Sequence, residues 1–172
     1  MYILVDPPIR TNFAAMTKKE LKEYKEWFFQ VKQERLDILI NASCLNSKIM
    51  FTVDSLQYLG EWLVKEVGEM KQKDDFTGLL SRGFDIGVYL GEFIINNHQG
   101  AYWIQHLDDK RNINFGEVVI RDFLTYDYNV SLVAYNMAIA VQEGSRGENV
   151  FSEIYNNLQK IPKKIHKHLM AK

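Results

Sequence analysis

The chain has 172 residues, of which 47% are hydrophobic and 13% aromatic, so we expect one globular domain and little disorder. The formal net charge of -1 argues against a general nucleic-acid-binding protein, which would carry a basic excess to neutralise phosphates. The single cysteine, Cys44, excludes an internal disulfide and a cysteine-based metal site, as is typical of a reducing compartment. Because no signal-peptide pattern and no apolar stretch of about 18 residues is found, the sequence predicts a cytoplasmic protein without a membrane span.

Charge is distributed unevenly along the chain. Residues 160–172 contain five lysines and no acidic residue, which leaves 16 basic and 22 acidic residues in the remainder. We expect residues 1–172 to form a single domain in which 162–172 is a frayed basic tail. An acidic body of this kind favours a basic protein partner.

The first half of the chain is mostly helical in pattern. Residues 2–5 favour a short strand. Thr17 followed three residues later by Glu20 predicts a capping box, and apolar residues at helical spacing continue from there to about Ala42. A second helix is predicted from about residue 52 to residue 68.

After one more helix, the sequence pattern changes from helical to strand-like. A third helix is predicted from Phe76 to Asn97. Residues 102–107 have a period of two, and residues 113–123 are rich in valine and isoleucine with Gly116 as a possible bulge. With the polar turn between them, these two segments predict a β-hairpin. Because a hairpin alone is marginally stable, it needs helices on one face, and residues 2–5 are a candidate third strand.

Two more helices complete the pattern, at residues 130–142 after a capping Asn129 and at residues 148–161 before Pro162. The order of helices, hairpin and helices predicts an α+β fold, mostly helical, with a small antiparallel hairpin or three-stranded sheet.

Three glycines distinguish the third predicted helix. Gly83, Gly87 and Gly91 recur every four residues and so lie on one flank. Each costs about 1 kcal/mol relative to alanine inside a helix, so we expect a neighbouring backbone to approach closely there. An alternative is that this flank mediates oligomerisation.

The same helix carries its polar residues in one narrow strip, formed by Ser81, Asp85, Tyr89, Glu92, Asn96 and Gln99. Asp85 and Glu92 are seven residues apart, so their Cα atoms are separated by about 10.5 Å on one face. The strip is either the solvent-facing side of a buried helix or the lining of a polar pocket. In a pocket, two carboxylates could bind a basic group or perform acid–base chemistry, with Tyr89 or Trp103 as a wall.

A third possibility is a structural salt bridge that joins Arg10 or Arg35 to Asp85 or Glu92 and removes the need for a ligand. The candidate binding residues are Arg10, Trp27, Arg35, Asp85, Tyr89, Glu92 and Trp103. No catalytic residue, metal ligand or cofactor is predicted, because no nucleophile, phosphate-loop or metal-binding spacing is present.

Several short motifs resemble those of a family of small uncharacterised bacterial proteins. They are Pro7-Pro8-Ile9-Arg10, Glu23 to Phe28, Glu34-Arg35, Asp54-Ser55-Leu56, Asp85 to Glu92 and Trp103. The resemblance spans roughly residues 7–123 and implies a bacterial source, but it brings no assigned activity. By analogy of size and style, such proteins include immunity proteins that neutralise toxins.

Three hypotheses follow. The first is a non-enzymatic protein-binding module, and more specifically an immunity protein for a basic toxin. The alternative is a small-molecule binder or hydrolase that uses the strip around Asp85 and Glu92. The third is an oligomerising module built on the glycine flank.

Overall fold

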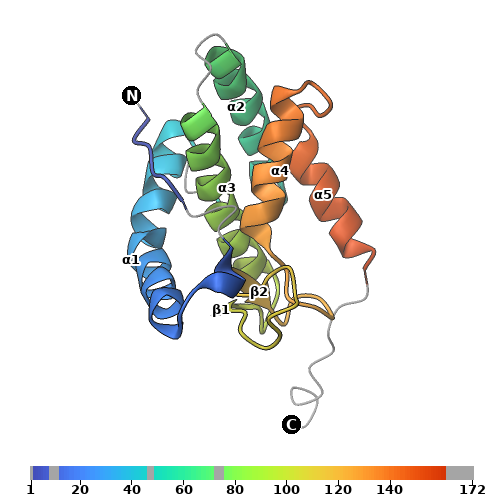
Figure 1. Cartoon of the computed structure of the whole chain (residues 1–172). Coiled ribbons are helices and arrows are strands. Elements are labelled where there is room, and N and C mark those ends of the chain that lie inside the picture. Colours follow the sequence, from blue (N-terminus) through green and yellow to red (C-terminus); the bar gives the residue numbers. More distant parts are fainter. Residues whose placement is uncertain (1, 8–11, 46–48, 72–75, 162–172) are drawn as a thin grey trace.

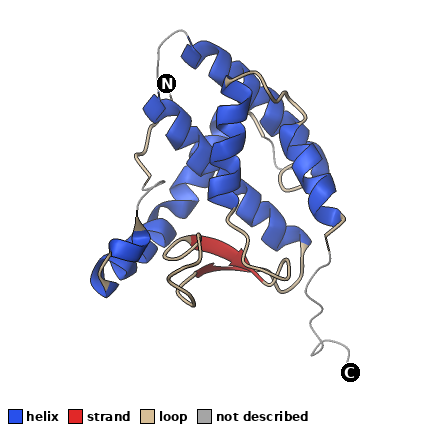
Figure 2. Cartoon of the chain, turned by 45° about the vertical axis from the view of Figure 1, so that its right-hand side comes forward, coloured by secondary structure: helices blue, strands red, loops and turns tan. Residues whose placement is uncertain are grey.

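The computed structural model describes residues 2–7, 12–45, 49–71 and 76–161, and these form five α-helices with a two-stranded antiparallel sheet at one end (Figures 1 and 2). This confirms the predicted mostly helical α+β fold. The elements are a short 3-10 helix η1 (Phe13–Ala15), α1 (Lys18–Ala42), α2 (Val53–Lys71), α3 (Phe76–Asn97), β1 (Tyr102–Gln105), β2 (Val118–Arg121), α4 (Val130–Gln142) and α5 (Val150–Gln159).

Two helices begin where side-chain caps were predicted. In α1 the Glu20 amide donates to the Thr17 hydroxyl at 3.3 Å, and the Thr17 amide donates to the Glu20 carboxylate at 2.7 Å, which confirms the capping box. In α4 the Asn129 side chain accepts from the Leu132 amide at 3.0 Å. Each cap satisfies an amide that the first helical turn leaves without a partner.

Helix α3 is the centre of the molecule, and every residue from Gly78 to Gly91 is buried. A Cβ atom added to Gly83 would lie 3.1 Å from the Tyr135 Cα of α4, and one added to Gly87 would lie 2.7 Å from the Ser131 Cα. The predicted close approach is confirmed. The glycine flank is occupied within the chain, so the oligomerisation hypothesis loses the surface that it requires.

The sheet is shorter than predicted. Tyr102 pairs with Arg121 and Gln105 with Val118, and the chain between the strands forms turns in which Gly116 has a φ of 85°. Beyond this ladder, Ile120 of β2 forms an isolated antiparallel bridge with Tyr128. The sheet's inner face packs beneath α1 and α3 (Figure 2).

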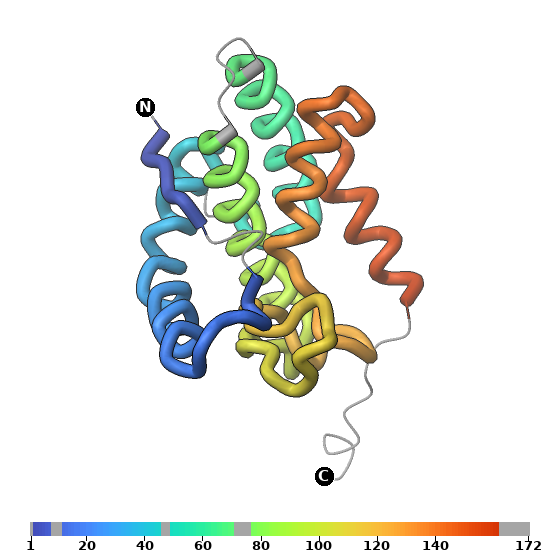
Figure 3. The backbone as a smooth tube through the Cα atoms, viewed as in Figure 1, coloured from blue at the N-terminus to red at the C-terminus, as the bar shows by residue number. Residues whose placement is uncertain are grey.

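The predicted third strand at residues 2–5 is wrong. This segment lies as an irregular chain beside α1 and α3 (Figure 3). Its main chain bonds to side chains instead of a strand: the Val5 amide donates to the Ser81 hydroxyl at 2.9 Å, and the Ile3 carbonyl accepts from Arg35 at 2.7 Å. The segment is therefore extended without pairing into the sheet, and Ile3 and Leu4 remain exposed.

Among the described helices, none carries an apolar stretch long enough to span a bilayer.

Candidate functional site

Asp85 is the centre of a buried ion pair. The Arg35 guanidinium donates from Nε to Asp85 Oδ1 at 2.8 Å and from Nη2 to Oδ2 at 2.6 Å. The Arg35 and Asp85 side chains are only 4% and 0% exposed. The Tyr2 hydroxyl donates to Asp85 Oδ2 at 2.5 Å and covers the pair from the N-terminal segment. At this position the polar strip is therefore neither a solvent-facing side nor a pocket lining, and the predicted alternative of a structural salt bridge is confirmed.

A second arginine extends this cluster. Arg82 donates through Nε and Nη2 to Glu66 Oε2 at 2.9 and 2.6 Å, and its guanidinium lies 4.4 Å from the centre of the Tyr2 ring. Burial raises the pKa of Asp85, while the bonds from Arg35 and Tyr2 oppose that rise. Burial and the Asp85 charge raise the pKa of the Tyr2 phenol, which remains a donor. Both Asp85 carboxylate oxygens accept hydrogen bonds from Arg35, and one also accepts from Tyr2. The cluster therefore links α1, α3 and the N-terminal segment.

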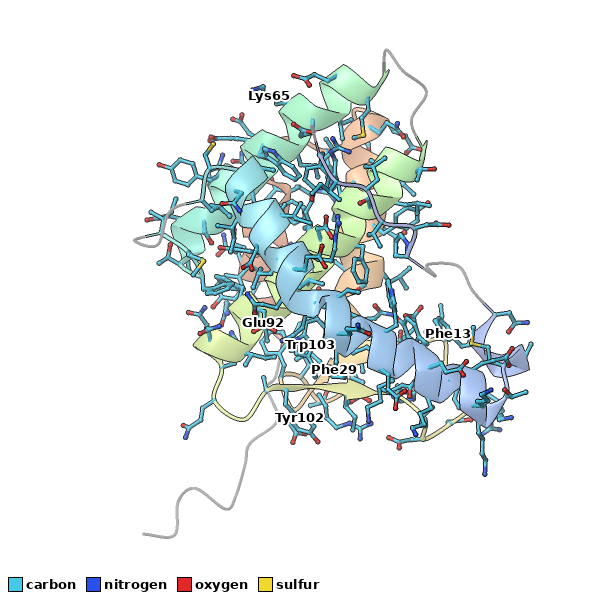
Figure 4. All side chains as sticks on the ribbon, turned by 90° about the vertical axis from the view of Figure 1, so that its left-hand side faces the viewer. Phe13, Phe29, Lys65, Glu92, Tyr102 and Trp103 are labelled. Atoms are coloured by element: carbon cyan, nitrogen blue, oxygen red, sulfur yellow. The ribbon has the colours of Figure 1, made fainter. Side chains whose placement is uncertain are left out.

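Glu92 is engaged by different partners. Its Oε1 accepts from the Trp103 indole at 2.8 Å and forms an ion pair with Lys32. The Lys32 and Glu92 side chains are 22% and 18% exposed, so this end of the strip is half-buried between α1, α3 and β1 (Figure 4). The Trp103 ring fills the space that a side chain at Gly91 would need.

The remaining candidates from the sequence are core positions. Tyr89 is fully buried, donates to the Ser55 hydroxyl at 2.7 Å and accepts from the Phe51 amide at 2.9 Å, which fixes the segment before α2. Trp27 is half-buried and packs against the Tyr24 and Phe84 rings. Arg10 lies outside the described residues. Of the described candidates, Arg35, Asp85 and Tyr89 are buried, whereas Trp27, Glu92 and Trp103 are partly exposed.

The sequence reasoning missed a second polar cluster on the sheet and its loops. Asp127 accepts from Arg121 Nε at 2.9 Å and Nη2 at 2.6 Å, and its Oδ2 lies 2.6 Å from His106 Nδ1. Arg121 Nη2 also donates to Asp108 at 2.5 Å. Arg121 and His106 lower the pKa of Asp127. We call these four residues the Asp127 cluster. Its members come from three segments, which are residues 106–108, the end of β2 and the loop before α4, so no single local spacing predicts the cluster.

The Asp127 cluster meets the minimal requirement for a metal site but is already neutralised. Ligand atoms of His106, Asp108 and Asp127 lie within 4.8 Å of one another, and an imidazole with two carboxylates suits a transition metal. Arg121, however, bonds to both carboxylates and supplies the positive charge between them. The other ring nitrogen of His106 is buried and has no hydrogen-bond partner among the described residues, so it is not placed to act on a substrate.

Four exposed apolar side chains belong to the hairpin and the following loop, which also carry this cluster. Tyr102 is the register partner of Arg121, and Leu107 and Tyr126 directly neighbour His106 and Asp127 in sequence. Ile113 precedes Asn114, whose side chain donates to the Asp127 carbonyl at 3.4 Å. We define the outer sheet surface as Tyr102 (43% exposed), Leu107 (49%), Ile113 (83%) and Tyr126 (52%) with Arg121. All five residues lie on the hairpin or on the loop that follows β2.

Glu117 directly precedes β2, and its carboxyl group forms no ion pair with any residue that the structure describes. The Tyr24 hydroxyl donates to its Oε2 at 3.3 Å. Burial raises the pKa of Glu117 to about 7. The group therefore changes charge near neutral pH at the contact between α1 and the sheet.

An apolar hollow lies between α2, α3 and α5, with a volume of about 290 Å³ that includes open solvent. Its lining is aliphatic and aromatic: Leu56, Leu90, Phe93, Ile94, Tyr128, Phe151, Ile154, Tyr155 and Leu158. Binding sites for small molecules combine such a lining with polar groups that orient the ligand. This hollow exposes an apolar wall only, which favours a packing gap over a substrate site.

No family model, no curated protein and no solved structure matches this chain. The resemblance to small bacterial proteins therefore remains a prediction from the sequence.

Proposed function

We propose that the chain is a non-enzymatic protein-binding module and that it contacts its partner through the outer sheet surface. The observation that supports this is the presence of four exposed apolar side chains on the hairpin and the following loop, the same segments that carry the Asp127 cluster. Tyrosine and arginine are enriched among the residues that dominate binding energy at protein interfaces. An exposed apolar patch bordered by charges is typical of such a surface.

Order in the loops supports the same proposal. Asp127 connects the end of β1 through His106 with the end of β2 through Arg121, and its main-chain carbonyl receives Asn114. Because these bonds hold the loops before any partner arrives, little conformational entropy is lost on binding. A side chain as exposed as Ile113 can then insert into a partner as an anchor.

A toxin-neutralising immunity role in the bacterial cytoplasm is the specific form of this proposal, and the acidic body of the chain supports it. The alternative of a hydrolase or small-molecule binder needs free carboxylates on the strip of α3. Asp85 and Glu92 instead face Arg35 and Lys32, which leaves that alternative without its reactive pair.

The test is affinity capture from bacterial lysate, with the wild type beside an Ile113→Ser, Tyr126→Ser double variant. The matched control is Ile3→Ser, because the Ile3 side chain is also 61% exposed and lies outside the outer sheet surface. We expect one partner to be retained by the wild type and by the control but lost by the double variant. A partner retained equally by all three proteins would contradict this location.

A further inference from the structure

The edge of β1 that faces away from β2 carries main-chain groups without partners. Ile120 of β2 exchanges two main-chain hydrogen bonds with Tyr128, at 2.9 and 2.8 Å, so its amide and carbonyl point away from β1. Trp103 is the register partner of Ile120, and two residues paired in this way both direct their main-chain groups outward. The amide and carbonyl of Trp103 therefore point away from β2.

The alternation along an antiparallel strand gives Gln105 the same direction as Trp103. The residue after it confirms the alternation, because the His106 amide donates to the Glu117 carbonyl at 2.8 Å and so points toward β2. Among the residues that the structure describes, no hydrogen bond reaches the amide or the carbonyl of Trp103 or of Gln105. We call these four groups the open edge of β1.

The two edges of the sheet differ. The bridge to Tyr128 closes part of the β2 edge, whereas no strand or bridge of the described chain lies along the open edge of β1. An unpaired edge is a template for a further strand, and proteins commonly protect it with a charged side chain or a proline. Residues 101–107 contain no lysine, arginine, acidic residue or proline. The open edge of β1 is therefore suited to pair with another strand.

Exposed aromatic side chains border this edge. Figure 4 shows β1 at the front of the molecule beneath α1, with Tyr102 on the strand and Phe29 on the helix. Their side chains are 43% and 40% exposed. The Phe29 ring contacts Phe28, and Phe28 contacts Trp103, with ring centroids 5.5 and 5.1 Å apart. A strand added at the open edge would therefore cover apolar surface in addition to forming main-chain hydrogen bonds.

We propose that the open edge of β1 pairs with the same edge of a second copy of the chain, so that two small sheets join into one sheet of four strands. The strand is self-complementary in an antiparallel arrangement centred on Ile104. Trp103 of each copy then lies opposite Gln105 of the other copy, and each such pair exchanges two main-chain hydrogen bonds. Ile104 faces its own counterpart, and Tyr102 faces His106 of the second copy, so no like charges oppose each other.

This pairing goes beyond the proposed function and does not depend on it. The outer sheet surface lies on a face of the joined sheet, whereas the open edge lies at the side of β1, so the dimer can still contact a partner. Two outer sheet surfaces then become neighbours, and a partner with two matching sites binds more tightly than a partner with one.

The experiment measures the oligomeric state and the amide hydrogen exchange of the full chain. We expect sedimentation velocity to show a monomer–dimer equilibrium between about 1 μM and 1 mM. Exchange at the Trp103 and Gln105 amides should slow as the dimer forms, whereas exchange at Tyr102 and Ile104, whose amides already face β2, should change little. A chain that stays monomeric over this range would overturn the proposal. A dimer without slower exchange at Trp103 and Gln105 would also overturn it.

Charges at position 104 test the register of the pairing. Ile104→Lys and Ile104→Glu each place like charges opposite each other, and we expect either variant to weaken the dimer about tenfold. An equimolar mixture of the two variants should dimerise again, because opposite charges then face each other. The matched control is the Ile113→Ser, Tyr126→Ser double variant of the outer sheet surface, which should dimerise as the wild type does.

Two results would count against the open edge. One is a mixture of the position 104 variants that dimerises no better than either variant alone. The other is an equal loss of the dimer in the double variant, which would place the contact between copies on the outer sheet surface instead. Unchanged amide spectra of the helices establish that each variant is folded.

Discussion

Asp85 and Asp127 are each held by an arginine fork and one further donor, yet they lie in different surroundings. Arg35 approaches Asp85 at 2.8 and 2.6 Å, and Arg121 approaches Asp127 at 2.9 and 2.6 Å. Tyr2 completes the first pair and His106 the second. The Asp85 side chain is 0% exposed between helices, whereas the Asp127 side chain is 11% exposed among loops and Arg121 is 21% exposed.

The difference shows that the same pairing chemistry serves two purposes. Inside the helices the pair neutralises charge that burial would otherwise make costly, so breaking it should affect the whole fold. On the sheet the pair is close to water, and its main effect is to order the loops that present exposed side chains. The four predictions below test this distinction, from the largest expected effect to the smallest.

Removing Asp85 should have the largest effect. Asp85→Ala leaves the Arg35 guanidinium buried without its counter-charge, and we expect the free energy of unfolding to fall by about 3–5 kcal/mol. Urea denaturation measures this loss. The control is the Arg35→Met, Asp85→Leu double variant, which removes both charges and should be much closer to the wild type. A loss below about 1 kcal/mol for Asp85→Ala would contradict the structural role.

Glu117 sharpens the comparison, because it is a half-buried carboxyl group that forms no ion pair with the described residues. Its pKa of about 7 in the folded protein exceeds the ordinary value of 4.5, so the folded state holds the proton more tightly. The stabilisation from this group is complete below pH 4.5 and is lost as the pH rises through 7. The difference is at most about 3 kcal/mol.

The measurement for Glu117 is the free energy of unfolding of the wild type and Glu117→Gln at several pH values between about 4 and 8. We expect the wild type to lose stability relative to the variant as the pH rises, because glutamine does not ionise. Parallel curves for the two proteins would show that Glu117 does not titrate in this range.

Removing Asp127 should have a smaller effect on stability and a larger effect on local order. We expect Asp127→Ala to cost about 1–2 kcal/mol, since Arg121 can turn to water. Amide hydrogen exchange should accelerate in residues 106–117 and 122–128 and stay unchanged in α3. If exchange in α3 accelerates equally, the Asp127 cluster supports the whole fold and the distinction from Asp85 fails.

The ion pair between Arg121 and Asp108 should contribute least to the free energy of unfolding. Asp108 is 67% exposed, so its pair with Arg121 competes with water. Asp108→Asn should change the free energy of unfolding by no more than about 0.5 kcal/mol. Thermal denaturation of Asp108→Asn and Asp127→Ala side by side measures the two losses of stability. An equal loss in the two variants would contradict the prediction that water screens the Arg121–Asp108 pair.

Local patterns in the sequence predicted the helices well. The bounds of α3 and α4 agree with the predicted ranges, because each is delimited by a cap, a glycine or a change of period that acts over a few residues. The spacing of Gly83 and Gly87 predicted a close backbone approach, because glycine destabilises a helix and packing against a neighbouring element could offset that cost. The Arg35–Asp85 pair was one of several pairings that the sequence left open.

Long-range contacts account for what the sequence did not predict. The polar strip on α3 looked like a surface because nothing local shows that α1 and residues 2–5 cover it. The residue types at 2–5 favour a strand, but the main chain there forms hydrogen bonds with the Ser81 and Arg35 side chains. The Asp127 cluster joins residues 6 to 21 positions apart across turns, a separation at which no periodicity operates.

The position of Trp103 makes it an optical reporter for the junction between the sheet and the helices. Its indole bonds to Glu92 and lies against Phe28, and it directly follows Tyr102 of the outer sheet surface. Its fluorescence emission should therefore respond both to unfolding and to a partner that binds at β1 and changes the surroundings of the indole. With Trp27 and Trp62 replaced by phenylalanine, the fluorescence of this one residue would follow binding at the sheet without an added label.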